Sequence, residues 1–497
     1  MIRNISIYIH IPFCVRKCNY CDFLSFSAPC DVKDRYLHSL INEIKSSGIW
    51  LCDKAKQSAG AYTSDKYCTS ANEKTLDNKS SDNENDDTKS LDNEVTYLVR
   101  SIFFGGGTPS SIDPDWIRKI LDTVREFYNV AQDAEITMEM NPGTVTPKSL
   151  SIYKEAGINR ISIGCQSLND SELKELGRIH DSKTFYDTFY AARDAGFDNI
   201  NVDLMSALPG QTVDSYRDSL NKIIALRPEH ISAYSLIIEE GTPFYDKYKD
   251  VIDRDLYDIE DELVKEGVVN KTDIDTNINT NIDTNIKTDN SATDNMNVEI
   301  SNYSDVDNDS VIANIDIKPL PSEADERQMY EDTIDILNKN GYHRYEVSNY
   351  ARNDGDYECY HNKAYWKRAE YLGLGIGAAG MIDDVRSTNT DDINEYCNYW
   401  YDFDIHENEM DRPLLEHEEL SKKACMEETM FLGLRMDEGV LVTAFEQKFG
   451  QSINEVYGSI IDDLCYKELI VIENDHIKLT EKGLELSNAV LSEFLLD

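Results

Sequence analysis

The sequence lacks any apolar run long enough to cross a membrane as a helix. Such a span needs roughly 18 to 20 consecutive apolar residues, and the longest candidate, Leu372–Ile382, is much shorter and rich in glycine. The N-terminal apolar run is interrupted by His10 and Pro12 and leads into Cys14 without the cleavage site of a signal peptide. We therefore expect a cytoplasmic protein without a transmembrane segment.

Positive charge is scarce as well. The 497 residues include 49 Lys and Arg against 93 Asp and Glu, which gives a net charge of −44. Proteins that bind nucleic acids neutralise phosphates with clustered cations, so this composition argues against a nucleic-acid partner and against an anionic membrane surface. The hydrophobic share of 40% is nevertheless sufficient for sizeable cores, and the length favours more than one domain.

Cysteines are few and unevenly spread. Three of the eleven crowd between Cys14 and Cys21, and the other eight are scattered. This distribution is typical of a reduced intracellular protein with one thiolate site, and it does not suggest a disulfide framework.

Two stretches are too polar to build a core. Residues 53–94 are dominated by Asn, Asp, Ser and Lys, and residues 265–318 contain isolated isoleucines in an acidic, Asn-rich repeat. Such sparse apolar residues cannot offset the loss of chain entropy on folding. We predict that both are disordered insertions, the first within a domain at 1–250 and the second before a segment at 319–410 that completes this domain.

Elsewhere, strand-like runs alternate with amphipathic helical patterns. Connections of helix length imply parallel strands with right-handed crossovers, and hence an α/β fold with a partial (β/α)6 barrel. Chemistry in such folds collects at the C-terminal ends of the strands. The predicted strands are Ser6–Ile11, Ser101–Phe104, Glu135–Met140, Arg160–Ile163, Ile200–Met205 and His230–Leu236, and the predicted helices include Trp116–Tyr128, Lys148–Ala156, Lys183–Ala195 and Ser215–Ala225.

Residues 413–497 follow a different pattern. Three helical stretches precede strands at Leu469–Ile472 and Ile477–Leu479, with a turn at Asn474–Asp475 and a closing helix. This order predicts a small winged-helix-like domain. Because the segment carries 18 acidic against 7 basic residues, we expect a packing or partner-docking role and no DNA reading.

Cys14, Cys18 and Cys21 form a Cys-x3-Cys-x2-Cys motif after the first predicted strand. Three thiolates at this spacing can bind three irons of a 4Fe–4S cube and leave the fourth iron open to another ligand. Two alternatives are a structural zinc site with His10 as the fourth ligand and ordinary core cysteines.

The surrounding motifs resemble those of the radical S-adenosylmethionine (SAM) superfamily, through these cysteines and the glycine-rich Gly105–Pro109. The sequence is most similar to the branch that contains oxygen-independent coproporphyrinogen III oxidase and the HemW heme chaperones. Apart from the two insertions, the resemblance covers nearly the whole chain. The segments that carry it are Tyr8–Phe13, Glu139–Gly143, Gly164–Ser167, Leu176–His180, Asp203–Met205, Leu208–Thr212, Glu346–Ala351 and Tyr371–Gly377.

This resemblance implies that SAM binds the open iron of the cluster. Reduction then cleaves SAM to methionine and a 5′-deoxyadenosyl radical. Glycines allow close approach of a backbone to a ligand, and a carboxylate can hold ribose hydroxyls. The glycines could instead form a tight turn, and Arg178 and Asp203 an internal ion pair. The implied SAM-binding residues are Tyr8, Tyr20, Gly106, Gly107, Thr108, Glu139, Gln166, Arg178 and Asp203.

Two features separate the chain from the oxidase pattern. The oxidase carries a fourth cysteine where this sequence has Phe23, and a longer segment before its cysteines than the thirteen residues found here. In both features the sequence is similar to those of the heme chaperones. The resemblance therefore implies heme binding and delivery to an apo-hemoprotein, with a membrane respiratory protein as the expected acceptor. Conversion of coproporphyrinogen III to protoporphyrinogen IX stays open as the alternative.

A heme-binding motif of the chaperones is similar to His361-Asn-Lys-Ala-Tyr365-Trp366. A neutral imidazole is a normal axial ligand of heme iron, and the two aromatic rings offer flat faces to a macrocycle. We expect heme b to bind at His361, Tyr365 and Trp366, with Cys359 as a second candidate ligand. Taken alone, a histidine beside aromatics is more often a hydrogen-bonded core residue.

Two further hypotheses concern a dinucleotide-binding motif and a structural role of the cluster. Gly375–Gly380 satisfies the Gly-x-Gly-x-x-Gly pattern of dinucleotide-binding folds, but the residues that follow form a poor helix, so close packing is the plainer explanation. The cluster could also be purely structural in a partner-binding module, which predicts no SAM cleavage. No catalytic residue is assigned from the sequence.

Overall fold

The computed structural model describes residues 2–58, 96–251, 317–403 and 414–496. Most of the two predicted insertions lies outside the described residues. The chain divides into a main unit of Met1–Cys18, Phe23–Leu236 and Leu320–Asp497, and a small unit of Asn19–Asp22 and Ile237–Pro319. In the small unit, the backbone N–H of Phe244 donates to the carbonyl oxygen of Asn19 at 2.9 Å, and the Phe244 and Tyr248 rings meet edge to face.

The main unit contains a twelve-stranded sheet in the order β12-β11-β10-β9-β1-β2-β3-β4-β5-β6-β8-β7. From β9 through β1 to β6 every neighbouring pair is parallel, which is the predicted partial (β/α)6 barrel. The remaining pairs are antiparallel. The parallel strands are β1 (Ile2–Ile11), β2 (Thr96–Gly106), β3 (Val130–Met140), β4 (Arg160–Gln166), β5 (Ile200–Ser206), β6 (His230–Ser235) and β9 (Glu370–Leu374).

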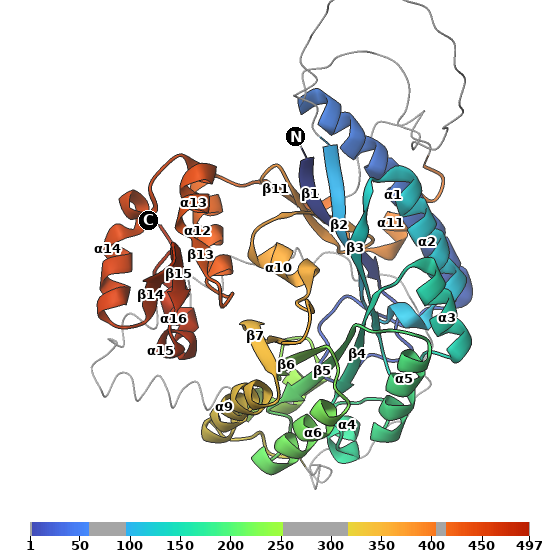
Figure 1. Cartoon of the computed structure of the whole chain (residues 1–497). Coiled ribbons are helices and arrows are strands. Elements are labelled where there is room, and N and C mark those ends of the chain that lie inside the picture. The colour runs from blue at the N-terminus through green and yellow to red at the C-terminus, as the bar shows by residue number, and fades with distance from the viewer. Residues whose placement is uncertain (1, 59–95, 252–316, 404–413, 497) are drawn as a thin grey trace, which may run out of the picture. The chain divides into compact units, whose positions relative to one another are not determined.

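All six predicted strands are present, and the predicted helices are confirmed within a few residues. In Figure 1, α2, α3 and α5 lie along one face of the sheet. The helices before the C-terminal region are α1 (Cys30–Ser58), α2 (Pro114–Phe127), α3 (Pro147–Ala156), α4 (Asp170–Glu175), α5 (Ser182–Asp194), α6 (Val213–Ala225), α9 (Glu323–Lys339), α10 (Tyr360–Trp366) and α11 (Ile393–Trp400), with a 3-10 turn η1 (Pro109–Ser111).

One boundary differs from the prediction. Residues 53–58, assigned from composition to a disordered insertion, continue helix α1. Ala55 of this last part is buried against the core, as is Leu51 just before it, so apolar contacts extend the helix beyond the point at which the composition changes.

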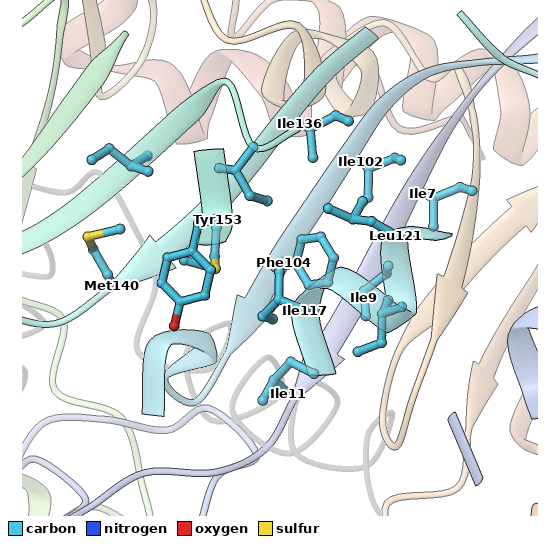
Figure 2. Close-up of a cluster of buried hydrophobic side chains, with 14 of the residues drawn as sticks. Ile7, Ile9, Ile11, Ile102, Phe104, Ile117, Leu121, Ile136, Met140 and Tyr153 are labelled. Atoms are coloured by element: carbon cyan, nitrogen blue, oxygen red, sulfur yellow. The ribbon is translucent and has the colours of Figure 1, made fainter. Parts of the chain in front are cut away.

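Alternation along the strands separates a hydrophobic core from a polar interior. Ile7, Ile9 and Ile11 of β1 and Ile102 and Phe104 of β2 pack against the helices, as Figure 2 shows with Ile117 and Leu121 of α2. Because successive side chains of a strand point to opposite faces, the residues between them face away from these helices. That other face carries the polar and aromatic side chains of the candidate site, which are Ser6, Tyr8, His10, Ser101, Phe103, Glu135, Thr137 and Glu139.

The antiparallel strands were not individually predicted. They are β7 (Tyr342–Glu346), β8 (Asn349–Arg352), β10 (Ala379–Ile382), β11 (Val385–Asn389) and β12 (Leu414–Glu419). The Gly-x-Gly-x-x-Gly segment lies between β9 and β10, not between a strand and a helix. A Cβ on Gly375 would lie 2.4 Å from the Tyr36 hydroxyl, and one on Gly377 would lie 2.6 Å from the Leu24 side chain. These glycines therefore serve close packing, as expected.

The C-terminal region has its own core and a three-stranded sheet, as expected of a winged-helix-like domain. The predicted turn at Asn474–Asp475 joins β14 to β15, and both residues have positive φ, as a two-residue hairpin turn requires. The elements are α12 (Lys422–Gly433), β13 (Val440–Leu441), α13 (Val442–Phe449), α14 (Ile453–Tyr466), β14 (Ile470–Glu473), β15 (His476–Leu479), α15 (Glu481–Glu485) and α16 (Ser487–Ser492).

A buried ion-pair cluster joins this region to the strands. The guanidinium of Arg368, at the end of α10, contacts the carboxylates of Glu428 on α12 at 2.7 Å and Asp384 at 2.6 Å. Removal of one partner of such a buried pair leaves an uncompensated charge, so this cluster fixes α12 beside the end of α10.

Among the described residues, no helix is long and apolar enough to span a membrane. Nine of the described cysteines are free, whereas Cys52 is disulfide-bonded. The reduced state expected for all cysteines is therefore not met at Cys52, although a single disulfide is not a framework.

Candidate functional site

The segment from Cys14 to Phe26, here called the cysteine loop, is fixed at its base by backbone hydrogen bonds. The N–H of Cys14 donates to the Phe26 carbonyl at 3.0 Å, and the N–H of Phe26 donates to the Pro12 carbonyl at 2.9 Å. The loop leaves the C-terminal end of β1 and returns to it before α1 begins. Cys14 is buried, Cys18 and Cys21 are half-buried, and none of the three forms a disulfide.

The described partners of the sulfur atoms suit thiolate ligands. The Thr108 hydroxyl lies 3.4 Å from the Cys14 sulfur, and Arg178 Nη1 donates to the Cys18 sulfur at 3.6 Å. Both side chains can donate hydrogen bonds to a sulfur atom. Cys21 and Tyr20 belong to the small unit, where both are half-buried. Cys14 and Cys18 of the main unit are donors of the kind that a cluster with one thiolate per iron takes.

A single-ion site is not supported at this loop. Among the described residues, no three His, Cys, Asp or Glu side chains gather around a point that could hold one metal ion. His10, the fourth ligand of the zinc alternative, uses both ring nitrogens. Its Nε2 lies 2.9 Å from the Leu24 carbonyl oxygen and must donate, so Nδ1 accepts from the Tyr8 hydroxyl at 3.1 Å.

The glycine-rich turn packs directly against the cysteine loop. The N–H of Gly107 donates to the Ile11 carbonyl at 2.9 Å, and that of Thr108 to the Phe13 carbonyl at 2.8 Å. A Cβ on Gly106 would lie 2.5 Å from the His10 ring, and Gly106 has a φ of 105°. The amides of Gly107 and Thr108 therefore hold this turn against the end of β1 and the residue before Cys14.

Two carboxyl groups face the polar interior, from the end of β3 and from the middle of β5. Burial and, to a smaller extent, the nearby Asp203 carboxylate raise the pKa of Glu139 to about 8, against the effect of the Gly106 amide. Burial also raises the pKa of Asp203 to about 6, although Asn201 and Ser162 donate hydrogen bonds to it. Glu139 is therefore protonated at neutral pH and can donate as well as accept a hydrogen bond.

Arg178 is linked to Thr108 through the side chain of Asn141. Its Nη2 donates to the Asn141 side-chain oxygen and to the Gly164 carbonyl, each at 2.7 Å. Asn141 in turn donates to the Thr108 hydroxyl at 2.7 Å. Asn141 was not predicted as a site residue, although its motif had been identified after the third strand. The positive charge of Arg178 also acts on Asp203, where it lowers the pKa of the carboxyl against the effect of burial.

Gln166 ends β4 in a strained conformation. It is buried with a φ of 67°, and its side-chain oxygen accepts from the Tyr234 hydroxyl at 3.0 Å. Non-glycine residues with positive φ are uncommon and collect at functional sites. Phe23, where the oxidase pattern has a fourth cysteine, is exposed.

His361 of α10 is buried on the polar face of β2. Its ring stacks on Phe103 with centroids 5.0 Å apart, and burial lowers its pKa to about 3. Ser101 donates to Ser6 at 2.8 Å and lies 2.9 Å from His361 Nδ1. Nδ1 therefore carries the proton and donates to Ser101, and Nε2 accepts from the Tyr365 hydroxyl at 3.3 Å.

Of the other two residues of this motif, Tyr365 contacts His361, whereas the ring of Trp366 packs against Arg435. The Tyr365 ring meets the His361 ring edge to face at 5.0 Å, and Arg435 lies over the Trp366 ring at 5.6 Å. Burial raises the pKa of Cys359, the second candidate ligand, to about 12, and the Cys359 thiol contacts Glu135 at 3.4 Å. Ser101 and Glu135 were not predicted as site residues, because they contact the motif only in the folded chain.

Comparison with known proteins identifies the family. Residues 8–223 match the model of the Radical SAM superfamily, and residues 420–486 match that of the HemN C-terminal domain. The chain is 30% identical over 492 residues to Heme chaperone HemW of Lactococcus lactis, covering 99% of this chain and 97% of the relative. The chain belongs to the HemW family of radical SAM proteins. Heme chaperone HemW of Bacillus subtilis is 29% identical over 99% of each chain.

The structural comparison agrees with the fold of this HemW-family chain. Coproporphyrinogen III oxidase (HemN) from Escherichia coli aligns with a TM-score of 0.65, over 99% of this chain and 90% of the other. Its sequence identity is only 19%, so this match shows the fold and not the activity. Membership of the radical SAM superfamily implies a 4Fe–4S cluster and SAM.

Proposed function

We propose that this HemW-family chain is a cytoplasmic heme chaperone on a radical SAM scaffold. It binds heme b near His361 and delivers it to an apo-hemoprotein, for which a membrane respiratory protein is the proposed acceptor. The observation that carries this proposal is the nearly full-length similarity to relatives named heme chaperones. Phe23 in place of the fourth cysteine of the oxidase pattern supports the same function.

The cluster would be held by Cys14, Cys18 and Cys21, next to the residues proposed to bind SAM. When bound, the reduced cluster supplies the electron that cleaves SAM. Thr108 and Arg178 contact two of the three sulfurs, so these residues hold and neutralise the thiolates. Glu139 and Asp203 present carboxyl groups that can bind hydroxyl groups of a ligand.

The protonation of His361 supports an axial role. A histidine that ligates a metal usually donates its other ring N–H to a fixed acceptor, which orients the ring. His361 Nδ1 has such an acceptor in Ser101, and the lone pair of Nε2 points toward the Tyr365 hydroxyl. Binding of iron at Nε2 therefore requires that Tyr365 release this hydrogen bond.

Titration of the protein with heme tests the site. We expect His361→Ala to lose the absorption bands of imidazole-ligated heme and to weaken binding by at least tenfold. Tyr365→Phe keeps the aromatic ring and frees Nε2, so it should bind heme at least as tightly as the wild type. An unchanged spectrum and affinity in His361→Ala would rule out His361 as the ligand.

An assay of both products separates the chaperone from the oxidase. The protein, reconstituted anaerobically, is given SAM, a low-potential reductant and coproporphyrinogen III, and 5′-deoxyadenosine and protoporphyrinogen are measured together. We expect SAM cleavage without protoporphyrinogen. Multiple turnovers to protoporphyrinogen would identify an oxidase, and absence of SAM cleavage would favour a structural cluster.

A further inference from the structure

The helix that carries the heme motif is capped by a residue from a distant strand. Four N–H groups at the start of any helix lack partners within the helix. Cys359, the N-cap residue of α10, provides no side-chain hydrogen bond to them. The carboxylate of Glu135, on β3, accepts instead from the N–H groups of Tyr360 at 2.9 Å and His361 at 3.1 Å.

The surroundings of Glu135 favour this arrangement. The Cys359 thiol donates to the same carboxylate at 3.4 Å. On the neighbouring strand, the buried Arg160 interacts electrostatically with both Glu135 and Cys359. A half-buried carboxylate with three donors and a nearby cation is held in one orientation, which a solvated side chain would not be.

His361 is therefore fixed at two points by two adjacent strands. Glu135 of β3 holds its backbone N–H, and Ser101 of β2 accepts from its ring Nδ1. The register pairs Ser101 with Glu135 directly across β2 and β3. The two contacts together determine where the α10 backbone lies and which way the imidazole turns.

We propose that Glu135 is a positioning residue for the heme ligand His361. It does not touch the iron, and it acts by fixing the first turn of α10 so that Nε2 is presented in one direction. This inference rests on the proposed heme-binding function and adds a residue outside the recognised motif. Loss of a partner that orients a metal ligand typically lowers metal affinity 10- to 100-fold.

Heme titration of Glu135 variants tests this proposal. We expect Glu135→Ala to raise the Kd for heme at least tenfold and to diminish the absorption bands that depend on His361. Glu135→Gln keeps an acceptor oxygen but loses the charge. This variant should therefore show the absorption bands that depend on His361, with a Kd for heme raised only several-fold above that of the wild type. The exposed Glu155, on α3, provides the matched control, and Glu155→Ala should bind heme as the wild type does.

The outcomes distinguish this inference from the proposed function. If wild type and His361→Ala give the same spectrum and affinity, the heme site itself is wrong. If the wild-type spectrum depends on His361 but Glu135→Ala binds heme unchanged, only the positioning role is overturned. Thermal unfolding without heme shows whether Glu135→Ala is folded. If Glu135→Ala is unfolded, the test relies on Glu135→Gln. A Kd for heme equal to that of the wild type in Glu135→Gln would overturn the positioning role of Glu135.

Discussion

Gly107→Ala is expected to lower the free energy of unfolding by about 2 to 3 kcal/mol and to prevent cluster loading. A Cβ at this position would lie 2.8 to 2.9 Å from the backbone N, C and O atoms of Phe13. Backbone atoms in a hydrogen-bonded loop cannot turn aside as a side chain can, so the extra methyl must displace the chain. Phe13 directly precedes Cys14, and the displacement therefore reaches the first cluster ligand.

Urea unfolding and the iron content after reconstitution measure the two effects. Gly458→Ala is the matched control, because Gly458 lies within helix α14 and its new Cβ would meet only Asn454 at 3.9 Å. That control should be neutral or slightly stabilising, since alanine favours a helix more than glycine does. Equal stability and iron content in Gly107→Ala and the wild type would show that the turn and the loop are not tightly coupled.

The parallel part of the fold was predictable because its strands place apolar residues at every second position, between connections of helix length. Ile7, Ile9 and Ile102 face the helices, and the helix-length connections leave few arrangements. The outer strands carry no such signal. Strand β12 is largely exposed and reads Leu-Leu-Glu-His-Glu-Glu, so nothing in its composition separates it from a loop before its partner β11 is known.

The same contrast applies to the candidate site. Short motifs such as the three cysteines and the glycine-rich turn can be recognised in the sequence because their residues lie close together in the chain. The contacts that orient them are not local, since Glu135 lies 225 residues before Tyr360 and Ser101 lies 260 residues before His361. No periodicity links such positions. Asn141 is intermediate, because its motif was recognised but its bond to Thr108 required the fold.

Glu139→Gln is expected to stabilise the protein increasingly as the pH rises. The pKa of Glu139 is about 8 in the folded chain, against a usual value near 4.5. Between these values the unfolded chain loses this proton while the folded chain keeps it, so the wild type loses stability as the pH rises from about 4.5 to 8. Glutamine has no proton to lose, and its advantage should reach the order of a few kcal/mol above pH 8.

Urea unfolding at pH 5.5, 7 and 8.5 measures this difference, with Glu126→Gln on the exposed face of α2 as the control. A constant difference in Glu139→Gln would mean that Glu139 is ionised throughout.

The lower stability of the wild type at high pH has a functional reason if Glu139 binds a hydroxyl group of a ligand, because a carboxylate is a stronger hydrogen-bond acceptor than an amide. SAM should therefore bind Glu139→Gln more weakly, and its affinity for the wild type should rise as Glu139 ionises.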